Sequence, residues 1–382
     1  MGKNVLKGIF GATICAITLF GFTLNVHAEE KTVSDENSLR SCVQGNNTCV
    51  LQNDITLSDK KSVTIAANAN VIINLNGKTI TENNLGITAG LIELGSGSTL
   101  TINDTTGNGG IKATTSYAAI TVGADSTLTV NNGNYTGYWY AISGNGTRHN
   151  TNITINNGTF KVIASSEAPG IYHPQNGTLT INGGYIEGTE GIEIRAGKLV
   201  VNGGTIVGTG SPTTVTPNGS GTTTEGAGIA IAQHTTKLPI NVEINGGTVK
   251  GYTALYESNP QKNDASAIAQ VKIAVNDGNF EAINGGTQAV YSEDVKGFIN
   301  GGTFNTDVTD YVADGVETSE NNGVFTVRKD IPEVNVPAEE NVSDKSETVN
   351  IENPKTADNL PLYLMGILAS ALVSGLCIRK LA

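Results

Sequence analysis

The sequence predicts an all-β protein, a single-stranded right-handed parallel β-helix with short helical caps. The prediction rests on a strand-like repeat, a high glycine content and a low charge content. Glycine accounts for 47 of 382 residues and charged residues for only 15%, which excludes a coiled coil and a charge-rich disordered chain. A formal net charge of −12 offers no basic surface for phosphate groups, so no nucleic acid partner is expected.

A short segment of the form apolar, polar, apolar, Asn recurs through the middle of the chain, usually with glycine after it. Successive asparagines lie between 20 and 43 residues apart, and periods of this size are typical of solenoids. The repeated asparagines are Asn76, Asn103, Asn131, Asn156, Asn182, Asn202, Asn245, Asn276 and Asn300. They have two explanations: a stacked amide ladder at one corner, or tolerance of asparagine for the turn geometry.

The coil from Leu179 to Lys198 shows what one turn of the solenoid contains. Three strand-like segments follow one another, 179–181, 185–187 and 191–194, with glycine turns between them. Alternate residues of such strands point inward, which predicts a central stack of Leu179, Ile181, Ile186, Ile192 and Ile194. About nine or ten parallel coils would pair their backbones with one another, and the crossover rule predicts a right-handed path.

The N-terminal end of the solenoid should carry a cap, because an open end exposes strand edges. Residues 35–43 predict a short amphipathic helix with Leu39 and Val43 facing inward. Cys42 and Cys49 are the only cysteines between the two termini, and we expect them to form a disulfide outside the cell. So few cysteines and four histidines predict no metal site and no cofactor.

The C-terminal end predicts a second cap. Residues 309–314 are expected to form a short helix, and 316–327 a hairpin that turns at Asn322-Gly323. Beyond it, 330–352 is acidic, spaced by prolines and without hydrophobic period, which is the composition of a linker. The β-helix domain with its caps is therefore expected to span 29–329.

Residues 1–28 have the pattern of a secretory signal peptide. Lys3 and Lys7 precede an apolar run, and Val26-His27-Ala28 offers a cleavage site. An uncleaved anchor helix is the alternative, but the run is short and interrupted by glycine and threonine. The mature chain would begin at Glu29.

Residues 353–382 combine a pentapeptide, an apolar stretch over about 360–378 and a basic pair, and the stretch is long enough to form a transmembrane segment. The pentapeptide is Asn353-Pro354-Lys355-Thr356-Ala357. The arrangement resembles the sortase cell-wall sorting signal of Gram-positive bacteria, with Asn and Ala where Leu and Gly are commonest. The resemblance implies attack of a sortase on the Thr356 carbonyl and transfer to a peptidoglycan precursor amine. A permanent membrane anchor is the alternative.

The repeat and the segment from Gly301 to Gly315 resemble the pectate-lyase-like β-helix superfamily, including surface proteins of Gram-positive bacteria that end in sorting signals. Polygalacturonase-like enzymes of this superfamily use Asn-Thr-Asp, Asp-Asp, Gly-His-Gly and Arg-Ile-Lys motifs. Here only Asn305-Thr306-Asp307 is present, and it falls in the C-terminal cap, so chance is the preferred explanation. The arginine element of pectate lyases is also missing. We therefore assign no catalytic residue.

Glu187, Glu190, Glu193 and Arg195 form the densest charged group of the chain. Strand alternation places Glu187, Glu193 and Arg195 on the outside. A glycosidase needs two carboxylates that flank a bond, but a solvated charged face is the simpler explanation and the one we expect.

The third strand of each coil aligns on a small residue, an aliphatic residue and an outward residue. Aromatic side chains with carboxylates nearby suit stacking on sugar rings, and loops on a rigid scaffold often carry function. Ordinary β-propensity of tyrosine is the alternative. The residues predicted to bind glycan in this column and its loops are Tyr138, Trp139, Tyr140, Tyr172, Glu193, Tyr256 and Tyr291.

Together these patterns predict an extracellular, wall-anchored surface protein that acts in adhesion or interaction. Its expected partners are the sortase, the peptidoglycan precursor and a host or environmental glycan or protein, with membrane contact only through the C-terminal segment before sorting. Two alternatives stay open. One is a polysaccharide lyase or glycoside hydrolase with a groove hidden from sequence, and the other is an inert structural stalk.

Overall fold

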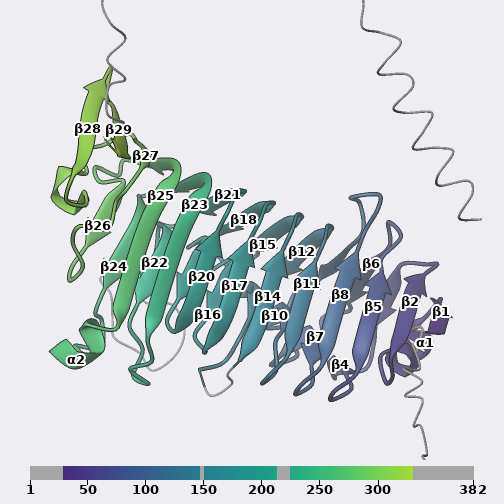
Figure 1. The fold of residues 1–382 in the computed structure, drawn as a ribbon. Coiled ribbons are helices and arrows are strands. Elements are labelled where there is room, and N and C mark those ends of the chain that lie inside the picture. Colours follow the sequence, from purple (N-terminus) through teal and green to yellow (C-terminus); the bar gives the residue numbers. More distant parts are fainter. Residues whose placement is uncertain (1–28, 147–149, 213–223, 330–382) are drawn as a thin grey trace, which may run out of the picture. The chain divides into compact units, whose positions relative to one another are not determined.

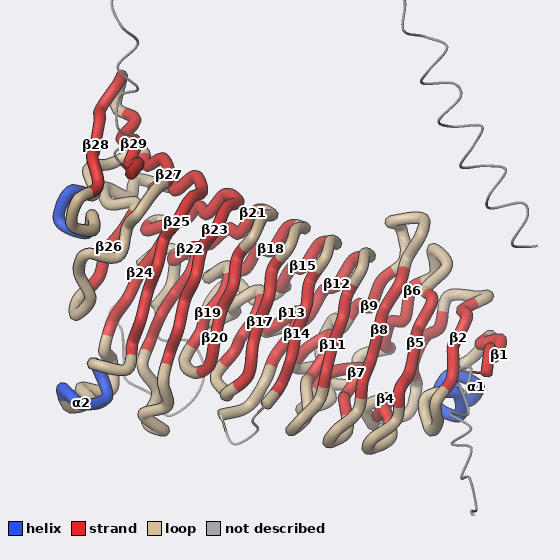
Figure 2. Tube along the Cα trace, in the orientation of Figure 1, coloured by secondary structure: helices blue, strands red, loops and turns tan. Residues whose placement is uncertain are grey.

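The computed structural model describes residues 29–146, 150–212 and 224–329, and these form a parallel β-helix (Figure 1). Short strands dominate, and helices are confined to a few brief segments (Figure 2). The predicted parallel β-helix is confirmed, while its handedness stays a prediction. The predicted signal peptide, linker and sorting signal lie outside the described residues. In the part of the chain that is described, no helix is long and apolar enough to cross a membrane.

Three stacks of parallel strands run along the solenoid. The first contains β2 (Asn47–Leu51), β5 (Asn70–Asn74), β8 (Thr99–Asn103), β11 (Thr127–Val130), β14 (Thr151–Ile155), β17 (Gly177–Ile181), β20 (Gly197–Val201) and the first halves of β23 (Ile240–Gly251) and β25 (Val271–Ala282). The second contains β3 (Ile55–Leu57), β6 (Thr79–Glu82), β9 (Gly110–Lys112), β12 (Asn134–Gly137), β15 (Thr159–Val162), β18 (Tyr185–Gly188), β21 (Thr205–Gly208), the second halves of β23 and β25, and β27 (Gly302–Phe304).

The third stack is a separate nine-stranded parallel sheet. Its strands are β4 (Val63–Ile65), β7 (Gly90–Leu94), β10 (Ala118–Thr121), β13 (Tyr140–Ser143), β16 (Ile171–His173), β19 (Ile192–Ile194), β22 (Ala227–Ala232), β24 (Thr253–Ser258) and β26 (Val290–Ser292). Nine strands in one stack agree with the nine or ten coils expected from the repeat.

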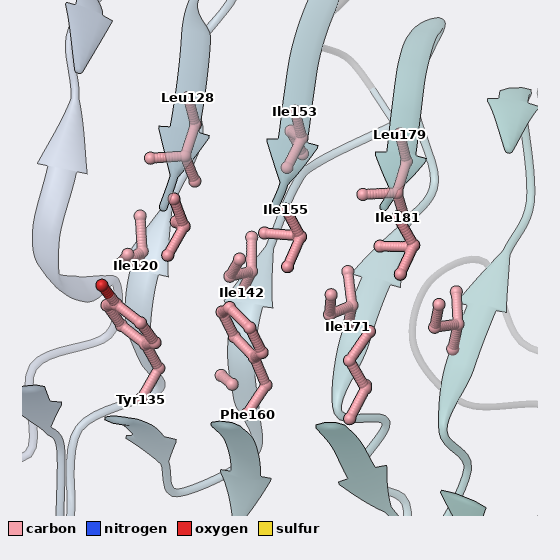
Figure 3. Packing of buried hydrophobic residues seen from close by; sticks show 14 of the residues in the cluster. Ile120, Leu128, Tyr135, Ile142, Ile153, Ile155, Phe160, Ile171, Leu179 and Ile181 are labelled. Atoms are coloured by element: carbon pink, nitrogen blue, oxygen red, sulfur yellow. The ribbon is translucent and has the colours of Figure 1, made fainter. Parts of the chain in front are cut away.

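The core is the central stack of aliphatic side chains that strand alternation predicts. All five inward residues predicted for one coil, from Leu179 to Ile194, are fully buried. Equivalent side chains of successive coils lie in columns (Figure 3). Aromatic rings also stack between coils, with the centroids of Tyr135 and Phe160 4.9 Å apart. Each buried aliphatic side chain contributes about 1.5–3 kcal/mol, so this core is the main source of stability.

The asparagine ladder exists. In every rung an Nδ2 group donates to the Oδ1 atom of the asparagine one coil earlier, over 2.7–3.5 Å. Its members are Asn74, Asn103, Asn131, Asn156, Asn182, Asn202, Asn245, Asn276 and Asn300. The first rung is Asn74, whereas the predicted Asn76 turns with φ 52° and donates to the Leu51 carbonyl.

Turn tolerance, the other explanation, holds for Asn76, which has a positive φ, but not for the asparagines of the ladder. From Asn131 onward the positive φ belongs to the glycine two residues after each ladder asparagine. At Gly158, for example, φ is 120°, and a Cβ atom would lie 2.8 Å from the Gly133 carbonyl oxygen one coil earlier. Glycine is needed here for backbone geometry and for close approach of coils, and asparagine for its side chain.

The N-terminal cap has the predicted helix and disulfide. Helix α1 (Glu36–Cys42) begins after the N-cap residue Asp35, whose side chain accepts from the Ser38 amide at 2.8 Å. Leu39 is fully buried beneath the helix, and Cys42 is bonded to Cys49. Strand β1 (Glu29–Val33), which the sequence analysis did not predict, pairs with β2 and covers its edge.

The C-terminal cap has the predicted hairpin, between β28 (Val316–Asn321) and β29 (Val324–Lys329). Asn322 and Gly323 both have positive φ, as a two-residue hairpin turn requires. The helix predicted over 309–314 shrinks to the 3₁₀ turn η1 (Thr309–Tyr311), because the next residues return to pairing with Ile299. A second unpredicted element, helix α2 (Ala265–Ile268), lies in the loop after β24.

Candidate functional site

The outward column of the nine-stranded sheet exists in the predicted register. Ser143 pairs with Tyr172, Tyr172 with Glu193, Glu193 with Ala230, Ala230 with Tyr256, and Tyr256 with Tyr291. Sequence alignment of the third strands therefore located this column correctly. The structure divides it into a covered part, from Ser143 to Ala230, and an open part, Tyr256 and Tyr291.

The covered part begins with an aromatic cluster. Tyr140 and Tyr172 stack with ring centroids 5.3 Å apart and are 5% and 3% exposed. Tyr117 and Trp139 pack against them, and Trp139 meets the ring of Tyr138 edge-on at 5.1 Å. The expectation of exposed aromatics is therefore wrong for Tyr140 and Tyr172, because neighbouring loops carry rings of their own that pack onto the column.

Two charged residues of the next coil, Glu193 in the column and Arg195 two residues after it, are also covered. The side chains of Glu193 and Arg195 are fully buried, with 3.9 Å between Glu193 Oε1 and Arg195 Nε. Arg195 Nη2 also donates to the Gln233 carbonyl at 3.2 Å. The expectation of a solvated charged face is wrong for this pair, although Glu187 is partly exposed and ion-paired with Lys161 at 3.2 Å.

The loops that follow β22 and β24 cover Arg195. Asn263 Nδ2 donates to the Gln233 side chain at 2.9 Å and to the His234 carbonyl at 3.0 Å. Gln233 Nε2 donates in turn to the Ala267 carbonyl in α2 at 2.9 Å. Burial, together with the Arg195 charge, lowers the pKa of His234 to about 4, which keeps this imidazole neutral at physiological pH.

A further buried carboxylate, Glu190, lies in the bend before β19. Thr189 Oγ1 donates to Glu190 Oε2 at 2.9 Å, and Glu190 Oε1 has no hydrogen-bond partner among the described residues. Burial raises the pKa of Glu190 well above its ordinary value, and the negative charges of Glu193 and Glu225 raise it further. Glu190 and Glu193 are therefore two buried carboxyl groups, of which Glu193 is paired with Arg195.

A histidine lies inside the solenoid next to this column. His173 pairs in register with the core residue Ile194 and is fully buried. Its Nδ1 atom is 3.1 Å from Gln175 Nε2, which also donates to Thr151 Oγ1 at 3.0 Å. Burial lowers the pKa of His173 to about 4. It points into the core and not toward the surface column, so its part is structural.

The open part of the column contains a cavity of about 230 Å³, which we call the tyrosine cavity. The residues that line it are Pro212, Thr224, Glu225, Ala227, Tyr252, Thr253, Tyr256, Gln288 and Tyr291. The rings of Tyr256 and Tyr291 stack with centroids 5.0 Å apart and 23° between planes. Thr224 is 6% exposed, and its Oγ1 atom has no hydrogen-bond partner among the described residues.

Glu225 is the only carboxylate among the residues that line the tyrosine cavity. Its Oε1 atom accepts a hydrogen bond from the Glu167 amide, which ties the loop after β15 to the cavity wall. Glu225, Thr224 and Tyr252 could not be found from the sequence, because they belong to a long insertion or to turns without a repeat signal. Their placement depends on loop geometry that no periodic pattern encodes.

Two other carboxylates, Glu257 and Glu293, follow the column tyrosines directly or closely in sequence, and they make different contacts. Glu257 points inward and accepts from Ser292 Oγ at 2.7 Å and from the Asp294 amide at 3.0 Å. Burial raises its pKa. Glu293 is exposed and accepts from the Asn259 amide at 3.0 Å.

The Asn305-Thr306-Asp307 tripeptide has bonds that explain it structurally. Asn305 Oδ1 accepts from the Ala282 amide at 2.8 Å, Thr306 Oγ1 from the Ala289 amide at 2.7 Å, and Asp307 Oδ1 from the Thr309 amide at 2.9 Å. Within the described ranges, no three His, Cys, Asp or Glu side chains are grouped so that they could hold a metal ion.

Comparison with known proteins adds no relative: no protein family, no curated protein and no solved structure matches this chain. The assignment of function therefore depends on the geometry of the solenoid and its tyrosine cavity.

Proposed function

We propose that this protein is a cell-surface β-helix that binds a glycan in the tyrosine cavity. The observation that carries the proposal is the stacked pair Tyr256 and Tyr291 in a cavity that Gln288 and Glu225 also line. Ligand sites are concave and mostly apolar, with a few polar groups that fix orientation. Aromatic rings offer apolar area to a sugar ring, and Gln288 and Glu225 offer hydrogen bonds to its hydroxyl groups.

Secretion and attachment to the cell wall are part of this proposal. The Cys42–Cys49 disulfide of the N-terminal cap is compatible with an oxidising, extracytoplasmic location. The signal peptide pattern of 1–28 and the sorting-signal resemblance of 353–382 supply the expected route and anchor. The pectate-lyase-like resemblance adds that proteins with this architecture commonly handle polysaccharides.

The site favours binding over hydrolysis. Glycoside hydrolysis uses two carboxyl groups on either side of the scissile bond. The lining of the tyrosine cavity provides one, Glu225, whereas Glu190 and Glu193 are fully buried. A carboxyl group without exposed surface cannot reach a glycosidic oxygen while the described loops hold these positions.

The experiment is a glycan array probed with the full chain, purified in detergent, and with the double variant Tyr256→Ala/Tyr291→Ala. We expect the double variant to lose at least about tenfold in affinity, since buried aromatic residues dominate binding energies. Tyr185→Ala is the matched control, because Tyr185 is a partly exposed strand tyrosine of the second stack. Absence of any retained glycan, or equal binding by the double variant, would contradict the proposal.

A further inference from the structure

The tyrosine cavity has a negative character that its role in glycan binding does not require. Its nine lining residues include one carboxylate, Glu225, and neither lysine, arginine nor histidine. Lys250, two residues before Tyr252, is held by Glu281 at 2.9 Å. The chain as a whole carries a formal charge of −12. The lining thus has no positive side chain to balance the charge of Glu225. A cation that balances it would have to be part of the ligand.

The tyrosine rings add to this negative character. The face of an aromatic ring attracts a cation through its quadrupole, and aromatic cages are the usual recognition site for substituted ammonium groups. Three rings, those of Tyr252, Tyr256 and Tyr291, line this one cavity. Burial raises the pKa of Tyr256, and Tyr291, Glu293 and Glu257 raise it further.

The size of the cavity limits what can enter. About 230 Å³ is below the roughly 300–1,000 Å³ of sites that enclose drug-sized ligands. A single head group or one sugar residue fits such a volume, and an oligosaccharide would have to continue outside it. The carboxylate of an acidic sugar would meet Glu225 at close range, which disfavours uronic acids and sialic acids.

We infer that the tyrosine cavity recognises an ammonium group carried by the glycan, with the three rings around the cation and Glu225 as its counterion. This inference rests on the proposed function and specifies the ligand of that same site. The group could be the amine of an amino sugar or a choline-type substituent. The two share one chemistry, a positively charged nitrogen bonded to carbon.

Calorimetric titration of the full chain in detergent tests the inference with small probes. Choline and glucosamine are compared with neutral isosteres, 3,3-dimethylbutan-1-ol for choline and glucose for glucosamine. We expect at least one ammonium probe to bind at least about tenfold more tightly than its isostere. Preference for choline or for glucosamine then identifies the source of the ammonium group. Equal affinity within both pairs, or no binding of either ammonium probe, overturns the inference.

Two variants separate charge from shape. Glu225→Gln keeps the oxygen that accepts from the Glu167 amide but removes the charge, and it should weaken the ammonium probe about tenfold without affecting the neutral isostere. Tyr256→Phe keeps the ring and should bind nearly as the parent chain does, whereas Tyr256→Leu should lose binding. Thermal unfolding of each variant identifies any that fails to fold. If Glu225→Gln and Tyr256→Leu both bind ammonium normally, the cavity is not the site.

The outcomes also separate this inference from the proposed function. Retention of neutral glycans on the array, lost in Tyr256→Ala/Tyr291→Ala, together with no ammonium preference, leaves glycan binding standing and removes only the cation. Binding of an ammonium probe without retention of any glycan on the array leaves recognition of the cation standing and removes glycan binding.

Discussion

The ladder face of the first stack and the outer face of the nine-stranded sheet share one backbone plan but use it differently. On the ladder face the same asparagine returns in coil after coil, each amide bonded to the next. On the nine-stranded sheet the outward residue changes along the column, from Ser143 through Tyr172 and Glu193 to Tyr256. A position that repeats holds the coils together, and a position that varies is free to form a site.

The loops follow the same division. Turns beside the ladder are short and carry a glycine at positive φ in most coils. Loops beside the nine-stranded sheet differ in length, carry helix α2, and bury Glu193 and Arg195 completely. The variable face is therefore expected to be more sensitive to single substitutions of charge, and the ladder face less so, because eight other asparagines remain.

The largest expected effect is at the buried arginine. Arg195→Leu removes the ion-pair partner of Glu193 and leaves a buried carboxylate behind. Loss of one member of a buried pair costs about 3–5 kcal/mol. We expect the free energy of unfolding, measured by urea titration at pH 7, to fall by that amount.

Lys198→Leu is the matched control for the arginine variant. Lys198 pairs with Glu243 at 3.0 Å, but both side chains are more than one-third exposed. Exposed pairs contribute about 0–1 kcal/mol, so this variant should unfold close to the parent. Equal losses in the two variants would show that the arginine is not held as an essential buried charge.

A smaller effect is expected on the ladder. Asn156→Ala removes the hydrogen bonds to Asn131 and Asn182, of 2.7 and 2.8 Å. Side-chain hydrogen bonds contribute about 0.5–1.5 kcal/mol each, and exposure places these at the low end, so we expect a loss of about 1 kcal/mol in urea titration. Asn157→Ala, next to the ladder and exposed, should change stability by less than about 0.5 kcal/mol. A ladder variant no worse than Asn157→Ala would show that the amide stack adds nothing.

The smallest expected effect is a pH-dependent gain from Glu190→Gln. Because the pKa of Glu190 in the folded state lies above the ordinary 4.5, the folded chain holds a proton that the unfolded chain releases as pH rises. The contribution of Glu190 is therefore most favourable below pH 4.5 and is lost as pH rises through the folded-state pKa. Glu190→Gln should match the parent at acid pH and exceed it in thermal stability at pH 7. A constant difference from pH 4 to pH 8 would contradict this.

Much of the fold could be predicted from sequence because its forces are periodic. Inward aliphatics such as Leu179 and Ile192 recur with the strand period, and their burial follows from alternation alone. The cap helix, the disulfide and the hairpin at Asn322-Gly323 have local signals as well. The 3₁₀ turn at Thr309 is shorter than predicted, since pairing with Ile299 competes with the helix.

The candidate site could be predicted only in part. The column that contains Tyr256 and Tyr291 follows from coil alignment, and the two rings do stack. The burial of Tyr172, Glu193 and Arg195 does not follow, because it depends on loops whose lengths and contacts have no period. The place of Glu225 and Thr224 in the cavity wall could not be predicted for the same reason.

The stacking of coils has a mechanical consequence. The tyrosine cavity lies on the last coils, around β22, β24 and β26, and a wall anchor would follow Lys329 at the end of β29. Tension between such an anchor and a ligand in this cavity would therefore pass only through the C-terminal interfaces, and the coils that begin at Glu29 would carry no load. Each coil contacts only its neighbours. The weakest of the loaded interfaces would therefore open first while the others stayed intact. A tethered chain of this kind would lengthen in steps under load. It would recover when the released strands paired again with the coils that had stayed folded.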